Sequence, residues 1–180
     1  MKVKAKPNIS KKDLIILVSL LILLILSLLF LDSIKIPKSN LLNILFFPFK
    51  EIYSYISLAI AILIAFSYFN RVYKSKLKKE SLTLILTIAF VFLIKFLIAR
   101  QRPASGIYIG SSFPSNHAAI PFSLLAFFKN KAYWLWLILS LFISISRVYW
   151  SYHYFSDFFA GAFIGYGIGL LIKNLKLKKK

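Results

Sequence analysis

Residues 146–157, SRVYWSYHYFSD, lie at the junction of two long apolar segments, 132–149 and 154–172. Such a junction needs only a turn, yet this one contains Arg147, His153 and Asp157. The whole chain has only two histidines and five acidic residues. Charged side chains at membrane depth are costly and usually functional, so this corner is the first candidate for a site.

The composition is that of an integral membrane protein. Of the 180 residues, 59% are hydrophobic, whereas a soluble domain is nearer half apolar. Apolar runs of about eighteen residues with few charges are typical of membrane-spanning helices. We therefore predict a single all-α domain over residues 1–180. The absence of cysteine excludes disulfides and thiolate metal sites.

The hydropathy pattern predicts a bundle of six transmembrane helices, at 14–31, 52–69, 81–99, 115–128, 132–149 and 154–172. The fourth is short: its 14 residues reach only about 21 Å, against a hydrocarbon core of about 30 Å. Its first turn is therefore expected below the membrane surface. The first run is too long for a signal-peptide core and is expected to be an uncleaved span. The apolar segment 36–52 is interrupted by two prolines and is expected to lie on the membrane surface.

The positive charges predict the orientation. The net charge is +19, but the cations form short blocks between apolar runs, which favours orientation signals and headgroup contacts over nucleic-acid binding. Of the 24 lysines and arginines, 17 fall on one side of the six-span arrangement. The positive-inside rule then makes both termini cytoplasmic and places the loops 100–114 and 146–153 on the outer face.

Two stretches near the third and fourth spans place further polar residues on that face. Lys95 precedes Arg102 by seven residues, so both lie on one face if the helix continues between them. In GSSFPSNHA, residues 110–118, Ser115, Asn116 and His117 open the fourth span. A Pro-Ser helix start supplies an N-cap and unpaired backbone N–H groups that can bind an anion.

The last pair is His153 and Asp157, which are four residues apart and would be within hydrogen-bond reach on a helix. Each feature alone has an ordinary structural explanation, since lysines near helix ends snorkel and lone histidines are mostly structural. Arg100 lacks a motif partner and is expected to be an interfacial anchor. What favours a site is that both histidines, an acid and three cations converge on one face.

Three stretches resemble signatures of the type 2 phosphatidic acid phosphatase superfamily. They are KFLIARQRP (K-x6-R-P), PSNH (P-S-x-H) and SRVYWSYHYFSD (S-R-x5-H-x3-D), which together span residues 95–157. Asn116 stands where many members have glycine, although a backbone N–H there can still bind phosphate.

This resemblance implies phosphoryl transfer through a phosphohistidine, without a metal ion or other cofactor. His153 would be the nucleophile, Asp157 its partner, and His117 the general acid and then the general base. The phosphate would be bound by Lys95, Arg102, Arg147, Ser115 and Asn116. The residue types fit, because a neutral imidazole can attack phosphorus and phosphoryl transfer depends on positioning and charge stabilisation. A two-metal mechanism needs bridging carboxylates, and Asp157 is the only acid that the sequence places nearby.

The predicted depth of the site indicates an outer-leaflet lipid phosphate or pyrophosphate, handled by a multi-pass protein of the cell inner membrane with its active site on the periplasmic or extracytoplasmic side. The chain is similar to undecaprenyl-pyrophosphate phosphatases, lipid A 1-phosphatases and phosphatidylglycerophosphate phosphatases, and all three substrates stay open. Besides the bilayer and the lipid substrate, no nucleic acid and no obligatory protein partner is expected. The alternatives are a lipid phosphotransferase and an inactive lipid-binding or transport protein, the latter disfavoured because all six motif side chains are present. Finally, Gly161, Gly165 and Gly169, at four-residue spacing, predict close helix packing.

Overall fold

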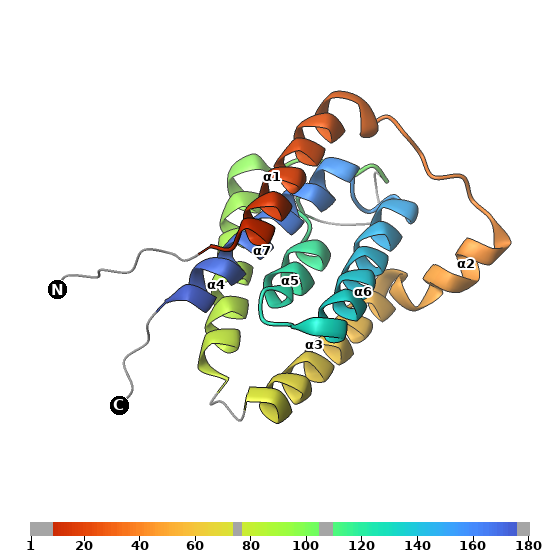
Figure 1. The fold of residues 1–180 in the computed structure, drawn as a ribbon. Coiled ribbons are helices and arrows are strands. Elements are labelled where there is room, and N and C mark those ends of the chain that lie inside the picture. The colour runs from red at the N-terminus through yellow and green to blue at the C-terminus, as the bar shows by residue number, and fades with distance from the viewer. Residues whose placement is uncertain (1–8, 74–76, 105–109, 176–180) are drawn as a thin grey trace.

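The computed structural model describes residues 9–73, 77–104 and 110–175, and the regular structure in these ranges is entirely helical. This confirms the all-α prediction. The elements, shown in Figure 1, are α1 (Lys11–Leu26), η1 (Ser27–Leu31), α2 (Asn40–Phe46), η2 (Phe47–Phe49), α3 (Glu51–Tyr73), α4 (Lys78–Ile98), α5 (Asn116–Leu125), α6 (Asn130–Tyr149) and α7 (Phe155–Asn174).

Five helical segments of the described chain are long and apolar enough to cross a membrane: Lys11–Leu31, Tyr53–Val72, Lys78–Ile98, Asn130–Tyr149 and Phe155–Asn174. Each agrees with a predicted span to within a few residues. Their outward surfaces are apolar; Leu29, Leu63 and Phe96, for example, are 66%, 67% and 83% exposed. Apolar surface on this scale is typical of contact with lipid rather than with water.

The remaining predicted span, 115–128, contains the short helix α5. Its 10 residues correspond to about 15 Å, so the expected shortness is confirmed, while a count of six spans stays a prediction. Nine of the ten residues are buried. Figure 1 shows α5 in the middle of the bundle, enclosed by the longer helices.

Glycines allow α7 to lie directly against α5. A Cβ atom at Gly161 would collide with the carbonyl oxygen of Ser115, and one at Gly165 with that of Ala119. Gly169 repeats the arrangement one turn later against Ser123. The predicted role of these glycines in close helix packing is confirmed. The contact sets the first turn of α5 beside the first turn of α7, where the predicted catalytic residues lie.

In the second half of α7, the hydroxyl of Tyr166 donates a 2.7 Å hydrogen bond to Asp13 in the first turn of α1, and Asp13 lines one pocket together with Lys173 and Asn174. The beginning of α1 and the end of α7 therefore lie on the same side of the bundle. This agrees with an even number of crossings, whereas the assignment of that side to the cytoplasm stays a prediction.

The segment between η1 and α3 projects from the bundle, with α2 set apart in Figure 1. Leu41 and Ile44 on α2 are 66% and 73% exposed, whereas Phe46 is buried, with its ring 5.1 Å from that of Tyr149. An apolar, exposed helix of this kind fits the predicted membrane-surface location, which stays a prediction. The following turn, η2, contacts α6 and reaches the candidate site.

Candidate active site

The centre of the site is the pair His153 and Asp157. His153 lies in the turn between α6 and α7, and Asp157 lies in the first turn of α7. The two therefore do not share a helix as expected, yet His153 Nδ1 is 3.4 Å from Asp157 Oδ2. The same oxygen accepts a 2.8 Å hydrogen bond from the backbone N–H of Tyr154. Both side chains are buried.

Burial also determines the charge of His153. It lowers the pKa of the imidazole from 6.5 to about 4, although the contact with Asp157 acts in the opposite direction. The ring is thus neutral at pH 7. If its proton is on Nδ1, facing Asp157, then Nε2 carries the lone pair. Nε2 lies 3.5 Å from Nη1 of Arg102, so it faces a cation that can also bind an anionic ligand.

The first turn of α5 lies against this pair. Ser115 occupies the N-cap position, as predicted, and its backbone N–H donates a 2.9 Å bond to the carbonyl oxygen of Asp157. Its hydroxyl, however, makes no capping bond. Within the described residues, Ser115 Oγ, Asn116 Oδ1 and His117 Nε2 are buried atoms without a hydrogen-bond partner. Buried polar atoms are rarely left unpaired, so these three are suited to contact a ligand.

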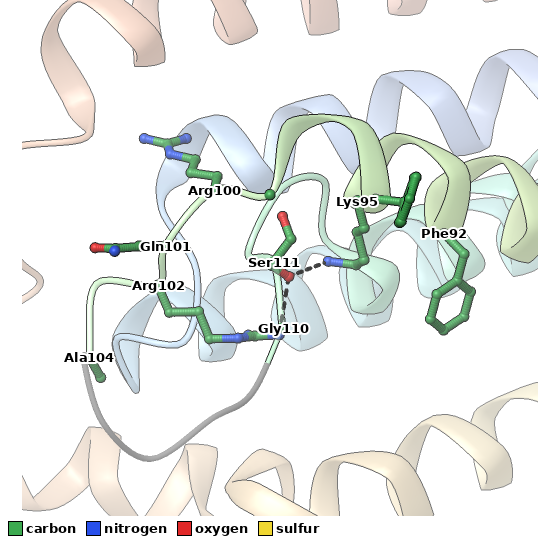
Figure 2. Close-up of a pocket in the computed structure, with 10 residues that line it drawn as sticks. Phe92, Lys95, Arg100, Gln101, Arg102, Ala104, Gly110 and Ser111 are labelled. Atoms are coloured by element: carbon green, nitrogen blue, oxygen red, sulfur yellow. Dashed lines mark hydrogen bonds between the residues drawn. The ribbon is translucent and has the colours of Figure 1, made fainter.

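The three predicted phosphate-binding cations bind backbone carbonyl groups around the pair. Lys95 Nζ donates to Ser111 O at 2.8 Å and to Ser112 O at 3.2 Å. Arg102 donates through Nη1 to Tyr152 O at 3.0 Å and through Nη2 to Ser111 O at 3.4 Å. The side chains of Lys95 and Arg102 converge on Ser111 in Figure 2.

Arg147, in the last turn of α6, is 2% exposed and donates a 2.8 Å bond to the carbonyl oxygen of Phe49. Its guanidinium carbon lies 4.2 Å from the centre of the Tyr152 ring. The carbonyl of Arg147 accepts the backbone N–H of His153 at 3.3 Å. The backbone of Arg147 is thus hydrogen-bonded to the turn that contains His153, and the side chain of Arg147 packs on Tyr152 in the same turn.

The route by which Lys95 and Arg102 meet differs from the prediction. The helix does not continue to Arg102: α4 ends at Ile98, and Ala99 adopts a left-handed conformation with φ of 47°. The chain then turns back, held by a 2.8 Å bond from the N–H of Ser112 to the carbonyl of Arg100. The prediction that the two cations lie together is confirmed. The expected reason, a continuous helix from Lys95 to Arg102, was wrong.

A pocket of about 820 Å³ opens beside these two cations. Its polar lining includes Lys95 and Arg102 together with Arg100, Gln101 and Ser111, and Phe92 and Phe96 on α4 contribute apolar surface. His117 and His153 do not line this pocket; they are buried behind the cations, each with 4% of its surface exposed. The cations therefore lie between the open pocket and the pair, since Arg102 lines the pocket and also lies 3.5 Å from His153 Nε2.

Arg100 is not the interfacial anchor that the sequence predicted. Its Nη1 is 3.1 Å from Asp157 Oδ1 and 2.6 Å from Ser156 Oγ, and its Nη2 is 2.8 Å from Asp32 Oδ2. Asp32 follows η1 and also accepts the backbone N–H of Ser156 at 2.9 Å. Neither contact could be predicted, because no periodicity connects residue 32 to residues 100 and 157.

The side chains of the site do not form an evident metal centre. Within the described ranges there is no cluster of three or more histidine and acidic residues. The two carboxylates near the histidines, Asp157 and Asp32, are both engaged by Arg100. The side chains around the His153–Asp157 pair include the cations Lys95, Arg102 and Arg147, and such a site is suited to an anionic ligand.

Comparison with known proteins agrees with this arrangement. The model of the PAP2 superfamily matches residues 76–180, more than half of the chain, including every candidate site residue. The chain belongs to the PAP2 superfamily. Over 60 residues it is 43% identical to the bacitracin transport permease protein BcrC of Bacillus licheniformis; this match covers 32% of the chain and only 30% of the length of that protein.

The solved structure of Aquifex aeolicus LpxE has a similar fold. It superimposes with a TM-score of 0.61 at 23% sequence identity, covering 84% of this chain and 94% of LpxE. At this identity the likeness shows the fold alone. The fold and the family are thus shown independently of the geometry of the site.

Proposed function

We propose that the protein is a membrane lipid phosphatase that transfers the phosphoryl group of its substrate to His153 and then to water. The observation that carries this proposal is the His153–Asp157 pair with three cations around it and unpaired polar atoms facing it. The neutral imidazole presents Nε2 beside Arg102. The first turn of α5 lies against Asp157, and its unpaired Ser115 Oγ and His117 Nε2 are the groups that we assign to the phosphate. Membership of the PAP2 superfamily supports the same reaction.

The residues then act in two steps. In the first, Nε2 of His153 attacks phosphorus, and His117 donates a proton to the leaving oxygen as the P–O bond breaks. Asp157 stabilises the positive charge that develops on the imidazole. In the second, His117 takes a proton from water, which attacks phosphorus and breaks the P–N bond. Lys95, Arg102 and Arg147 stabilise the non-bridging oxygens in both steps.

The pocket supports a lipid as the substrate. Phe92 and Phe96, which line it next to Lys95 and Arg102, are 58% and 83% exposed on a helix long enough to cross the membrane. A molecule with an anionic head and an apolar chain can place the head between the cations and keep the chain along α4 in the bilayer. Undecaprenyl pyrophosphate, lipid A 1-phosphate and phosphatidylglycerophosphate all have this character.

A panel of these three lipids and phosphatidate, offered to the purified protein in detergent, tests the proposal. We expect the wild-type protein to release inorganic phosphate from at least one of these lipids. The His153→Ala variant should release none. Phosphate that appears on a second lipid, without release into water, would favour the phosphotransferase. No turnover of any lipid by a folded wild-type protein would favour the inactive lipid-binding or transport protein.

We also propose that the site faces the extracytoplasmic side of the inner membrane, which the asymmetry of the positive charges supports. The chain has no cysteine, so a single introduced cysteine reports its own location. An Ala104→Cys variant should react with an impermeant maleimide in intact cells or spheroplasts, and a Lys78→Cys variant, at the other end of α4, only after lysis. The reverse pattern would place the site in the cytoplasm.

A further inference from the structure

A partly buried network of charges connects three separate parts of the chain next to His153. Arg100, after the end of α4, lies between Asp32 after η1 and Asp157 in α7, at 2.8 and 3.1 Å. Ser156 completes the network, since its hydroxyl donates to Asp32 Oδ2 at 2.5 Å and accepts from Arg100 Nη1 at 2.6 Å. The Arg100 guanidinium is also covered by the ring of Tyr154, 4.0 Å away.

These contacts engage both oxygens of the Asp157 carboxylate. Its Oδ1 is held by Arg100, and its Oδ2 receives the N–H of Tyr154 and faces Nδ1 of His153. A carboxylate bound at both oxygens cannot rotate without losing charge-assisted hydrogen bonds, which are the strong ones. The oxygen that faces His153 is therefore kept in the one position that accepts a proton from Nδ1.

The charges in this network also favour the reaction. Arg100 alone would neutralise Asp157 and weaken its effect on a developing imidazolium charge. Asp32 supplies a second carboxylate to the same guanidinium, so the three side chains together keep one net negative charge beside His153. At short range in a buried site, one charge changes interaction energies substantially.

Arg100 also lines the pocket beside Lys95 and Arg102, so direct binding of the substrate phosphate must be considered. Its side chain, however, points away from those two cations in Figure 2. Both of its terminal nitrogens are engaged with carboxylates. The geometry therefore assigns it to the opposite side of the site from the phosphate.

We propose that Arg100 and Asp32 are positioning residues that hold Asp157 in the orientation that keeps the proton of His153 on Nδ1 and leaves Nε2 free to attack. This rests on the proposed function for its catalytic meaning, but the tautomer itself can be measured without any substrate. A network that only stabilises the fold would lower the melting temperature without changing the tautomer.

The test is nitrogen NMR of protein labelled with ¹⁵N-histidine in detergent micelles at pH 7. The chain has only two histidines, and a His117→Asn variant assigns them. We expect the wild-type His153 to carry its proton on Nδ1. In Arg100→Met and Asp32→Asn, we expect a mixture of tautomers with an unchanged His117 signal. Lys95→Met, which removes a cation from the phosphate side whose hydrogen bonds go to Ser111 and Ser112 rather than to His153, is the matched control and should leave the proton on Nδ1.

Kinetics supply the second measurement. Outer hydrogen-bond partners of metal-bound histidines typically contribute about 10- to 100-fold to activity; we expect a loss of this order here, and it should fall on kcat with little change in KM. If Arg100→Met does not fold, Arg100→Lys replaces it, because a lysine reaches only one of the two carboxylates. An unchanged tautomer in both the Arg100 and Asp32 variants would overturn the proposal. Absence of phosphatase activity in the wild type, with the tautomer effect present, would instead overturn the proposed function alone.

Discussion

Replacing Asp157 with asparagine should reduce turnover by between about three and about four orders of magnitude while preserving the shape of the side chain. Asp157 Oδ2 lies 3.4 Å from His153 Nδ1. Two unit charges at about 3.4 Å attract each other by about 5 kcal/mol at an effective dielectric constant of about 20. That attraction exists only when the imidazole becomes positive, so it stabilises the transition state rather than the ground state. A loss of about 5 kcal/mol corresponds to a reduction in kcat of about 5000-fold.

The hydrogen bonds at Asp157 add to this effect. Both of its oxygens accept bonds from donors, Arg100 on one side and Tyr154 and His153 on the other. Asparagine has only one acceptor oxygen, so its amide NH₂ must face one of these donors. If it faces His153, the imidazole proton moves to Nε2 and removes the attacking lone pair.

The assay is phosphate release at saturating lipid substrate, together with a melting temperature to show that the variant is folded. Asp13→Asn is the matched control, because it neutralises a carboxylate at the other end of α7, where Asp13 binds Tyr166. It should keep kcat near the wild-type value. A folded Asp157→Asn variant with a kcat within tenfold of the wild type would refute the assigned role of Asp157.

Three further predictions follow from the structure. Because burial lowers the pKa of His153 to about 4, the nucleophile stays neutral on acidification, so kcat/KM should fall only as the pH drops through about 4; an acid limb near 6.5 would contradict the buried environment. Hydrolysis should persist in excess EDTA, because the phosphate is met by cationic side chains; loss on chelation with recovery on adding magnesium would reject the metal-free mechanism. Gly165→Ala should lower the melting temperature and the yield of folded protein, because its Cβ meets the Ala119 carbonyl. Gly167→Ala is the control and should be tolerated, because its Cβ would lie 3.9 Å from Leu17 Cδ2. Equal effects of the two substitutions would show that the α5–α7 contact does not determine stability.

Much of this architecture could be predicted from the sequence because lipid imposes strong constraints. Long apolar runs must be helices in a bilayer, and five of the predicted spans correspond to membrane-length helices. The motif residues stand out by type and spacing, and the resemblance to the superfamily signatures supplied the roles predicted for them. The glycines of α7 were interpretable for a similar reason, since a four-residue spacing marks one face of a helix.

The parts that could not be predicted depend on tertiary contacts without a periodic signal. The apolar run predicted the end of α4 to within one residue, at 99 against Ile98, but no sequence pattern shows how the chain turns back after it to bring Arg102 beside Lys95. The contacts of Arg100 with Asp32 and Asp157 join positions 68 and 57 residues apart. Acidic residues are rare in this chain, with only five in total. That rarity was the one sequence signal that Asp32 has a specific partner.

The most direct test of the central claim is to trap phosphate on the enzyme. In a His117→Ala variant the water of the second step has no general base, so an activated substrate such as ³²P-labelled p-nitrophenyl phosphate should load the enzyme faster than the label is released. We predict one acid-labile, alkali-stable phosphoryl group per chain, located at His153 by mass spectrometry and absent from the His117→Ala/His153→Ala double variant. Turnover of the same substrate with no label on the protein, or label that remains in the double variant, would contradict a phosphohistidine at this position.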